Sequence, residues 1–235
     1  MLLHDTLSII IPAYNEAGNI ELALDDLLDI LKDDLNKVEI LVFNDASTDN
    51  TGEIADDYAS RYPCIKVIHN NPNKGLGYNY RKGIEMATMN YIMLIPGDRE
   101  INIVSIKAIM TLIGFSDIVI PFIQNYKIRP LLRQALSKSF TLTINAISGL
   151  NITYFNGPVV HKATLLKARK INTDGFAYQA ELLVKMILEG ATFTQVSMII
   201  QPREHGVANA LNPQNILRVT RTIFDLIKYR LFRKE

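Results

Sequence analysis

The sequence holds a single cysteine, Cys64, among 235 residues. One thiol cannot form a disulfide within the chain, so we expect a protein that folds in a reducing compartment. The formal net charge is only +1, and this gives no sign of a nucleic-acid partner. The sequence therefore predicts a cytoplasmic protein that does not bind nucleic acid.

Long apolar runs are also missing. No stretch reaches the roughly 18–20 apolar residues that span a bilayer. The opening residues, MLLHDTLSIIIPAYN, lack the basic segment, apolar segment and cleavage site of a secretory signal. Neither the G-x-G-x-x-G fingerprint nor a P-loop is present, so we expect no nicotinamide or flavin dinucleotide site.

Apolar strand patterns and helical patterns alternate in the first half of the chain. Such alternation indicates parallel strand–helix units. No linker or repeat divides the sequence, so we expect an α/β fold with a mostly parallel, Rossmann-like sheet and helices on both faces. Strands are predicted at 7–15, 38–45, 65–70, 91–98, 117–122 and 192–203, and helices at 19–32, 51–62, 77–87, 129–149 and 181–190.

Polar residues follow three of the predicted strands. In a parallel sheet the carboxyl ends of the strands form the ligand-binding edge, where acids accept from a ribose or hold a divalent cation. Plainer interpretations exist: Asp45 and Ser47 could cap the helix that begins near Asp49, residues 14–16 could be a polar turn between a strand and a helix, and Asp98 could belong to a turn. The residues concerned are Tyr14, Asn15 and Glu16, then Asp45 and Ser47, then Asp98, Arg99 and Glu100.

Four segments together resemble glycosyltransferase family 2: SIIIPAYNEAGNI, ILVFNDASTDNT, NPNKGLGYNYRKGIEMA and YIMLIPGDRE. The resemblance implies a GT-A fold, a nucleotide-sugar donor and inversion at the anomeric carbon. Residues 128–167 also resemble the polyprenyl-phosphate branch, to which dolichol-phosphate mannose synthases belong. A polyprenyl phosphate is therefore the implied acceptor.

The resemblance implies residues for the donor. Asp45 would contact the base or ribose, and Lys74 and Gly75 would lie near the nucleotide, where glycine permits close backbone approach. Arg203 would approach the phosphates. The residues implied for the rest of the nucleotide pocket are Pro12, Ala13, Tyr14 and Glu16.

Arg129 and Arg133 match arginines that face the acceptor phosphate in the polyprenyl-phosphate enzymes. They are four residues apart on one helical face, so both guanidinium groups can converge on one phosphate; a solvated basic face is the alternative. A phosphomonoester is already anionic near neutral pH, so it needs positioning more than a general base. Glu181 is expected to bind or orient a substrate, or to be a first-turn acid favoured by the helix dipole.

Asp98 matches the last acid of the family's D-x-D metal motif, whose first acid is replaced here by Pro96. Because Mg²⁺ usually takes only one or two carboxylates plus phosphates, we expect Mg²⁺ or Mn²⁺ to be held by Asp98, Glu100 and the donor diphosphate. Two alternatives remain open: the site binds without turnover, or cations neutralise the diphosphate in place of a strongly held metal. Those cations would be Arg99, Lys74 or Arg203.

The last segment is basic. From Asn215 to Glu235 the chain holds six Lys or Arg against two acids, a local +4, which leaves 1 − 4 = −3 for the remainder. A basic amphipathic helix suits an anionic membrane surface, or it packs on its own domain or a second subunit. We expect a glycosyltransferase domain at 1–212 and this helix at 213–235.

The predicted function is transfer of a sugar from a UDP- or GDP-linked donor to a polyprenyl phosphate, with peripheral contact at the cytoplasmic face of a membrane. One alternative is a family 2 enzyme that acts on a glycan or protein hydroxyl, which requires a general base. The turn at 151–160, NITYFNGPVV, favours it because the family's acid is missing there. A non-catalytic nucleotide-sugar-binding module is the other alternative, favoured by Pro96.

Overall fold

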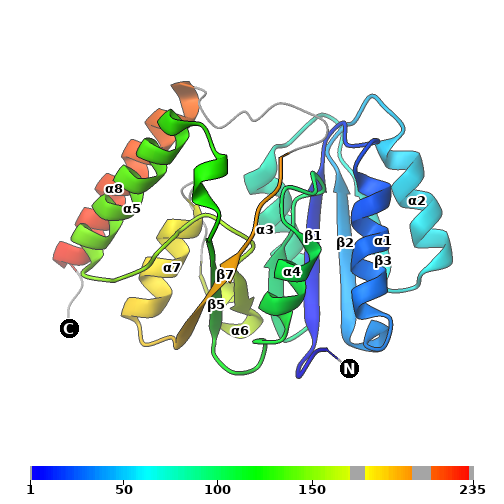
Figure 1. Ribbon diagram of the computed structural model, residues 1–235, viewed down its shortest axis with the longest axis horizontal. Coiled ribbons are helices and arrows are strands. Elements are labelled where there is room, and N and C mark those ends of the chain that lie inside the picture. The colour runs from blue at the N-terminus through cyan, green and yellow to red at the C-terminus, as the bar shows by residue number, and fades with distance from the viewer. Residues whose placement is uncertain (1, 170–177, 203–212, 233–235) are drawn as a thin grey trace.

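The computed structural model describes residues 2–169, 178–202 and 213–232. Within these residues one sheet has the strand order β3-β2-β1-β4-β6-β5-β7 (Figure 1). Strand β6 runs antiparallel to both of its neighbours, and the other pairs are parallel. The predicted α/β class and mostly parallel sheet are confirmed. The strands are β1 Leu7–Ala13, β2 Val38–Asn44, β3 Ile65–His69, β4 Tyr91–Leu94, β5 Ile118–Ile123, β6 Val160–Lys162 and β7 Phe193–Met198.

Helices cover both faces of this sheet, because parallel strands are apolar on both sides. Every residue of β2 is buried. Side chains of α1, α2 and α4 form one apolar core with the sheet, and those of α3, α6 and α7 form the other. The helices are α1 Ile20–Leu31, α2 Thr51–Arg61, α3 Leu76–Met86, α4 Ile103–Met110, α5 Leu131–Ser148, α6 Ala163–Lys167, α7 Tyr178–Leu188 and α8 Pro213–Phe232, with short 3-10 turns at Leu35–Lys37 (η1) and Tyr126–Ile128 (η2).

Helix α1 shows how well the spacing of apolar residues predicts which side chains are buried in the first half of the chain. Its buried side chains are those that the 3–4 spacing predicts, namely Ile20, Ala23, Leu24, Leu27, Leu28 and Leu31.

The second half departs further from the sequence patterns. Strand β4 ends at Leu94, earlier than predicted, although the backbone N–H of Ile95 still donates to the carbonyl of Ile10 at 3.0 Å. The patterns do not predict β6, which is only three residues long, or α4, which begins where the side chain of Asn102 accepts from the backbone N–H of Val104. The predicted strand at 192–203 becomes β7, which ends at Met198.

The C-terminal helix α8 lies beside α5 in Figure 1 and packs against both α5 and α7. Thr222 and Leu226 are buried on its inner side, whereas Phe224 and Leu231 are exposed. No helix in the described parts of the chain combines the length and apolarity needed to cross a membrane.

The register of the sheet fixes where the loops meet. Ala13 at the end of β1 lies beside Asn44 at the end of β2, and Ile10 of β1 lies beside Leu94 at the end of β4. Because these strands are parallel, the turns that follow all three emerge at one edge of the sheet.

Among the residues that the structure describes, an ionisable side chain in the core lacks a polar partner. His161 of β6 is fully buried between Ile92 and Ile118 on the neighbouring strands. Neither of its ring nitrogens has a hydrogen-bond partner among the residues that the structure describes. Burial, with a smaller contribution from the charge of Arg169, lowers the pKa of His161 to about 3.

This histidine predicts a pH dependence of stability. Between pH 6.5, the ordinary pKa, and pH 3 the unfolded chain binds a proton at His161 that the folded protein does not, so the free energy of unfolding falls as the pH is lowered. At pH 5 the loss from this group is about 2 kcal/mol relative to pH 8. Urea unfolding at both pH values should show it, and His161→Leu should show a difference smaller by that amount. Equal differences in the two proteins would contradict the prediction.

Candidate active site

Three turns form the edge at which the strands end, and each holds a non-glycine residue in left-handed backbone conformation. These are Asn15 after β1 (φ 54°), Ala46 after β2 (φ 63°) and Arg99 after β4 (φ 52°). Such residues cost conformational energy and cluster at functional sites. The first two turns are tied together, because Asn15 N donates to Ser47 Oγ at 3.0 Å and Thr48 N donates to Asn15 Oδ1 at 2.8 Å.

Asp45 organises the next loop. Its side chain is buried and accepts hydrogen bonds from the backbone N–H groups of Lys74 and Gly75, both at 2.8 Å. Gly75 has a φ of 82° and directly precedes α3, a conformation that glycine adopts without strain. The alternative that Asp45 caps α2 is wrong: Asp49 accepts from the N–H of Thr51 instead.

Apart from Arg203, the remaining residues predicted for the donor lie at or beside this edge. Tyr14 is 52% exposed, and the carboxylate of Glu16 accepts from the side chain of Asn19 at 2.7 Å. The Lys74 ammonium lies 6.0 Å from the centroid of the Tyr78 ring. Also predicted were Pro12 and Ala13, which end β1, and Arg203, which lies outside the described residues.

A cleft of about 180 Å³ opens beyond β4. Leu76, the first residue of α3, lines it, so the cleft adjoins the loop that Asp45 holds. Asp98 is 7% exposed, and its Oδ1 accepts from the N–H of Glu100 at 3.1 Å. The polar side chains that line the cleft are those of Asp98, Glu100, Arg129, Arg133, Tyr154, Asn156, Tyr178 and Gln179.

The two predicted arginines do converge, and they meet on Glu100. They do not share one helical face, because Arg129 is extended and precedes α5, which begins at Leu131. Arg129 Nη2 donates to Glu100 Oε1 at 3.0 Å, and Arg133 Nη2 lies 3.9 Å from the same oxygen. The Arg129 side chain is only 10% exposed, so the alternative of a solvated basic face is wrong for this residue.

Tyr154 completes this group, since its hydroxyl accepts from Arg129 Nη1 at 3.0 Å. Burial raises the pKa of the Tyr154 hydroxyl, which keeps it neutral. Burial alone would lower the pKa of Arg129, but Tyr154 and Glu100 outweigh it and raise that pKa. Arg129 is therefore a buried, fully charged cation at the cleft.

The cleft offers few protein ligands for a divalent cation, which is the usual situation for Mg²⁺. Asp98 and Glu100 are two carboxylates in one cleft, and Mg²⁺ usually adds substrate phosphates to one or two such groups. No group of three or more acidic, histidine or cysteine side chains that could hold a metal occurs in the described parts of the chain. Arg99, named above as a substitute cation, bonds instead to Asp26 of α1 at 2.8 and 3.1 Å.

Glu181 takes a different place from the other predicted residues. It is buried in α7 and accepts from Lys185 Nζ at 2.5 Å. Tyr178 and Gln179 of the same helix line the cleft, whereas Glu181 does not.

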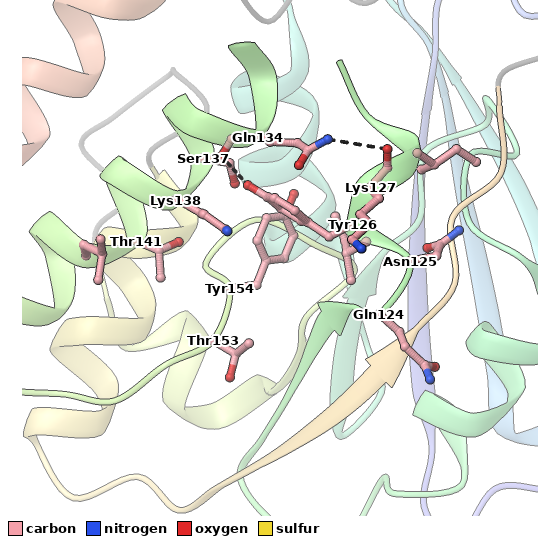
Figure 2. A pocket seen from close by; sticks show the side chains of 13 residues that line it. Gln124, Asn125, Tyr126, Lys127, Gln134, Ser137, Lys138, Thr141, Thr153 and Tyr154 are labelled. Carbon is pink, nitrogen blue, oxygen red and sulfur yellow. Dashed lines mark hydrogen bonds between the residues drawn. The ribbon is translucent and has the colours of Figure 1, made fainter. Parts of the chain in front are cut away.

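A second cavity, of about 860 Å³, lies between η2 and α5 (Figure 2). Lys138 points from α5 toward the ring of Tyr126, whose centroid lies 5.7 Å from its Nζ. Ile128, Leu142 and Tyr154 also line this cavity. Tyr154 therefore forms a wall that both cavities share. Sequence reasoning missed Tyr154, and the one signal near it was the turn at 151–160, which departs from the family pattern.

Comparisons with known proteins concern the family and the fold of this chain. The sequence model of Glycosyl transferase family 2 matches residues 8–176. The glycosyltransferase YibD of Escherichia coli strain K12 is 34% identical over 106 residues, 45% of this chain, and the chain spans only 30% of that protein. The undecaprenyl-phosphate mannosyltransferase of Micrococcus luteus is 26% identical over 230 residues, which are 90% of this chain and 91% of that protein.

A solved structure matches the fold over the whole chain. Glucosyl-3-phosphoglycerate synthase of Mycobacterium tuberculosis, in complex with Mn²⁺, UDP and glucosyl-3-phosphoglycerate, has a TM-score of 0.68 and 15% identity; the match covers 99% of this chain and 82% of that one. At this identity the likeness concerns the fold alone.

The Asp45 contacts predict a stability effect. Asp45→Ala leaves the N–H groups of Lys74 and Gly75 without their acceptor, and an unsatisfied buried donor costs about 1–3 kcal/mol. Urea unfolding should show a loss of about 2–3 kcal/mol. Asp57→Ala is the control, because its exposed ion pair with Arg61 contributes about 0–1 kcal/mol. Equal losses in the two variants would contradict the structural role of Asp45.

Proposed function

The chain belongs to Glycosyl transferase family 2, and we propose that it transfers a sugar from a UDP- or GDP-linked donor to a polyprenyl phosphate. One observation carries this proposal: Arg129 and Arg133 meet on a single oxyanion in the cleft that Asp98 also lines. Paired guanidinium groups are the side chains best suited to a phosphate. A named undecaprenyl-phosphate mannosyltransferase aligns over 90% of the chain.

The donor occupies the edge where β1 and β2 end. Asp45 holds the loop that brings Lys74 and Gly75 to this edge, and exposed Tyr14 provides an aromatic face near the ends of these strands. A solved structure of the same fold in complex with UDP supports a nucleotide donor. The other residues that we assign to the nucleotide are Pro12, Ala13, Glu16 and Arg203.

The reaction is a displacement at the anomeric carbon. An oxygen of the acceptor phosphate forms the new bond to that carbon, the bond to the donor diphosphate breaks, and the configuration inverts. A phosphomonoester is anionic near neutral pH, so it needs no general base, and Arg129 and Arg133 orient it. Glu181 pairs with Lys185 within α7. We assign it an indirect orienting role through that helix, whose Tyr178 and Gln179 line the cleft.

A divalent cation, Mg²⁺ or Mn²⁺, fits beside Asp98 and would neutralise the leaving diphosphate. Asp98 is the residue that we assign to it first, because its carboxylate lines the cleft at the end of β4. Glu100 is the second, although its carboxylate contacts Arg129 in this structure.

The acceptor side faces α5 and α8. A polyprenyl phosphate resides in a membrane. Helices α5 and α8 lie side by side (Figure 1), and both expose apolar side chains. We assign peripheral membrane contact to this surface, and the second cavity, beyond Tyr154, to the first isoprene units of the lipid. The exposed apolar residues are Leu131, Leu132, Leu136 and Leu142 of α5, and Phe224 and Leu231 of α8; exposed Arg221, Lys228 and Arg230 accompany them.

The acceptor assignment predicts the effect of removing both arginines. Arg129→Ala with Arg133→Ala should lower sugar transfer to a polyprenyl phosphate at least about 100-fold, because groups that hold the reacting oxyanion are typically worth that much. Hydrolysis of the donor, measured as nucleoside diphosphate release, should persist. The charge-matched control is Arg61→Ala with Lys82→Ala, two exposed cations on α2 and α3. Normal transfer by the first variant would refute the acceptor site.

The cation assignment predicts that Asp98→Asn lowers transfer by about 100-fold or more, since metal neutralisation of the leaving group is worth several kcal/mol. Mn²⁺ binding in the presence of UDP, followed by electron paramagnetic resonance, should weaken in parallel. Asp56→Asn, an exposed aspartate, is the control. If Asp98→Asn and the unaltered protein are equally active with and without EDTA, the assignment fails.

A further inference from the structure

The ion pair between Glu100 and the two arginines is mostly buried, but it does not satisfy all the hydrogen-bond donors of the arginines. The side chains of Arg129, Glu100 and Arg133 are 10%, 15% and 29% exposed. One oxygen of Glu100 lies near both guanidinium groups, at 3.0 Å from Arg129 and 3.9 Å from Arg133. The contact to Arg133 is longer than a normal hydrogen bond. A single carboxylate therefore reaches both cations but satisfies only one of them well.

Arg129 also retains an unused donor. Its Nε is buried and has no hydrogen-bond partner among the residues that the structure describes. Nε and Nη2 lie on the same edge of a guanidinium group, and an anion that binds bidentately takes both. Glu100 takes Nη2 alone. A buried donor without an acceptor is costly, so this edge is poised for a ligand with more oxygens in a better position.

From this geometry we propose that Glu100 is a built-in counter-ion: its carboxylate occupies the place of the acceptor phosphate between Arg129 and Arg133 and is displaced when that phosphate binds. The inference rests on the proposed function. A phosphate has three free oxygens, enough for Nε and Nη2 of Arg129 and for Arg133 at once. In this role Glu100 is a specificity-determining residue of the acceptor site.

The charge of the acceptor phosphate favours displacement of the Glu100 carboxylate from the arginines. Among the residues that the structure describes, the guanidinium groups of Arg129 and Arg133 face the carboxylate of Glu100, and a second carboxylate, Asp98, lines the same cleft. A phosphomonoester carries nearly two negative charges at neutral pH, and like charges at close range in a partly buried site repel strongly. With Glu100 released, two cations face one dianion. A neutral alcohol brings no charge with which to replace the carboxylate, so the site selects phosphates over hydroxyls.

The released carboxylate has a place to go. The N–H of Glu100 donates to Asp98 Oδ1 at 3.1 Å, so Glu100 is anchored next to the carboxylate that we assign to the divalent cation. The carboxylate oxygens of Glu100 can bind the arginines or coordinate that cation, but they cannot fully do both at once. A bound cation therefore favours release of Glu100 from the arginines. Because coupling between sites is reciprocal, the cation and the acceptor phosphate should each tighten the binding of the other.

Calorimetric titration with a short acceptor analogue, farnesyl phosphate, tests the proposal. In EDTA, Glu100→Gln should bind farnesyl phosphate about fivefold or more tightly than the unaltered protein, a typical size for coupling between sites. Farnesol should bind both proteins alike. Glu85→Gln is the control, because it removes the same charge from an exposed position on α3 and should change nothing. Unchanged or weaker binding of farnesyl phosphate by Glu100→Gln overturns the counter-ion role, because a merely structural role predicts that result.

A second measurement does not depend on the folding of that variant. In the unaltered protein, Mn²⁺ with UDP should tighten farnesyl phosphate binding by about fivefold or more, and Glu100→Ala should lose most of this gain. Absence of the gain in the unaltered protein contradicts the exchange of Glu100. If Arg129→Ala with Arg133→Ala binds farnesyl phosphate as well as the unaltered protein, the proposed acceptor site fails as well. If binding needs the arginines and Glu100→Gln is no tighter, only the counter-ion role fails.

Discussion

The parallel pairing of β1 with β2 and β4 is the constraint on which the rest of the molecule depends. Parallel strands leave no short connection, so each strand is followed by a helix that returns along one face of the sheet. Both faces are thereby covered, and the turns after these strands emerge at one edge. The left-handed residues, the loop held by Asp45 and the acids after β4 all lie at that edge because of this pairing.

The sequence predicted this framework well because its signals are local. The spacing of apolar residues in α1 and the unbroken apolar run of β2 are visible within a dozen residues, and both match the structure. Strand β6 has no such signal. It has three residues, and it is held by antiparallel pairing with β4 and β5, which are distant from it in the sequence. His161 lies on this strand, so its burial between two neighbouring strands was equally beyond a local pattern.

Chain proximity explains why the site was only partly predicted. Glu100 stands two residues from Asp98, so sequence reasoning assigned both carboxylates to a metal. The structure places the Glu100 carboxylate against Arg129, which belongs to the segment between η2 and α5. Tyr154 joins the same group from beyond the end of α5. These contacts depend on how α5 packs against the sheet. The spacing of residues within one segment cannot predict that packing.

The shared wall at Tyr154 has an evolutionary consequence. Residues that we assign to the donor lie mostly between Pro12 and Gly75. The arginines, Tyr154 and the second cavity come from one contiguous stretch, 123–154, although Glu100, which lies against both arginines, is outside it. Recombination or drift within that stretch would alter the acceptor while the nucleotide side stayed intact. In a fold organised in this way, the donor side and the acceptor side can change separately during evolution.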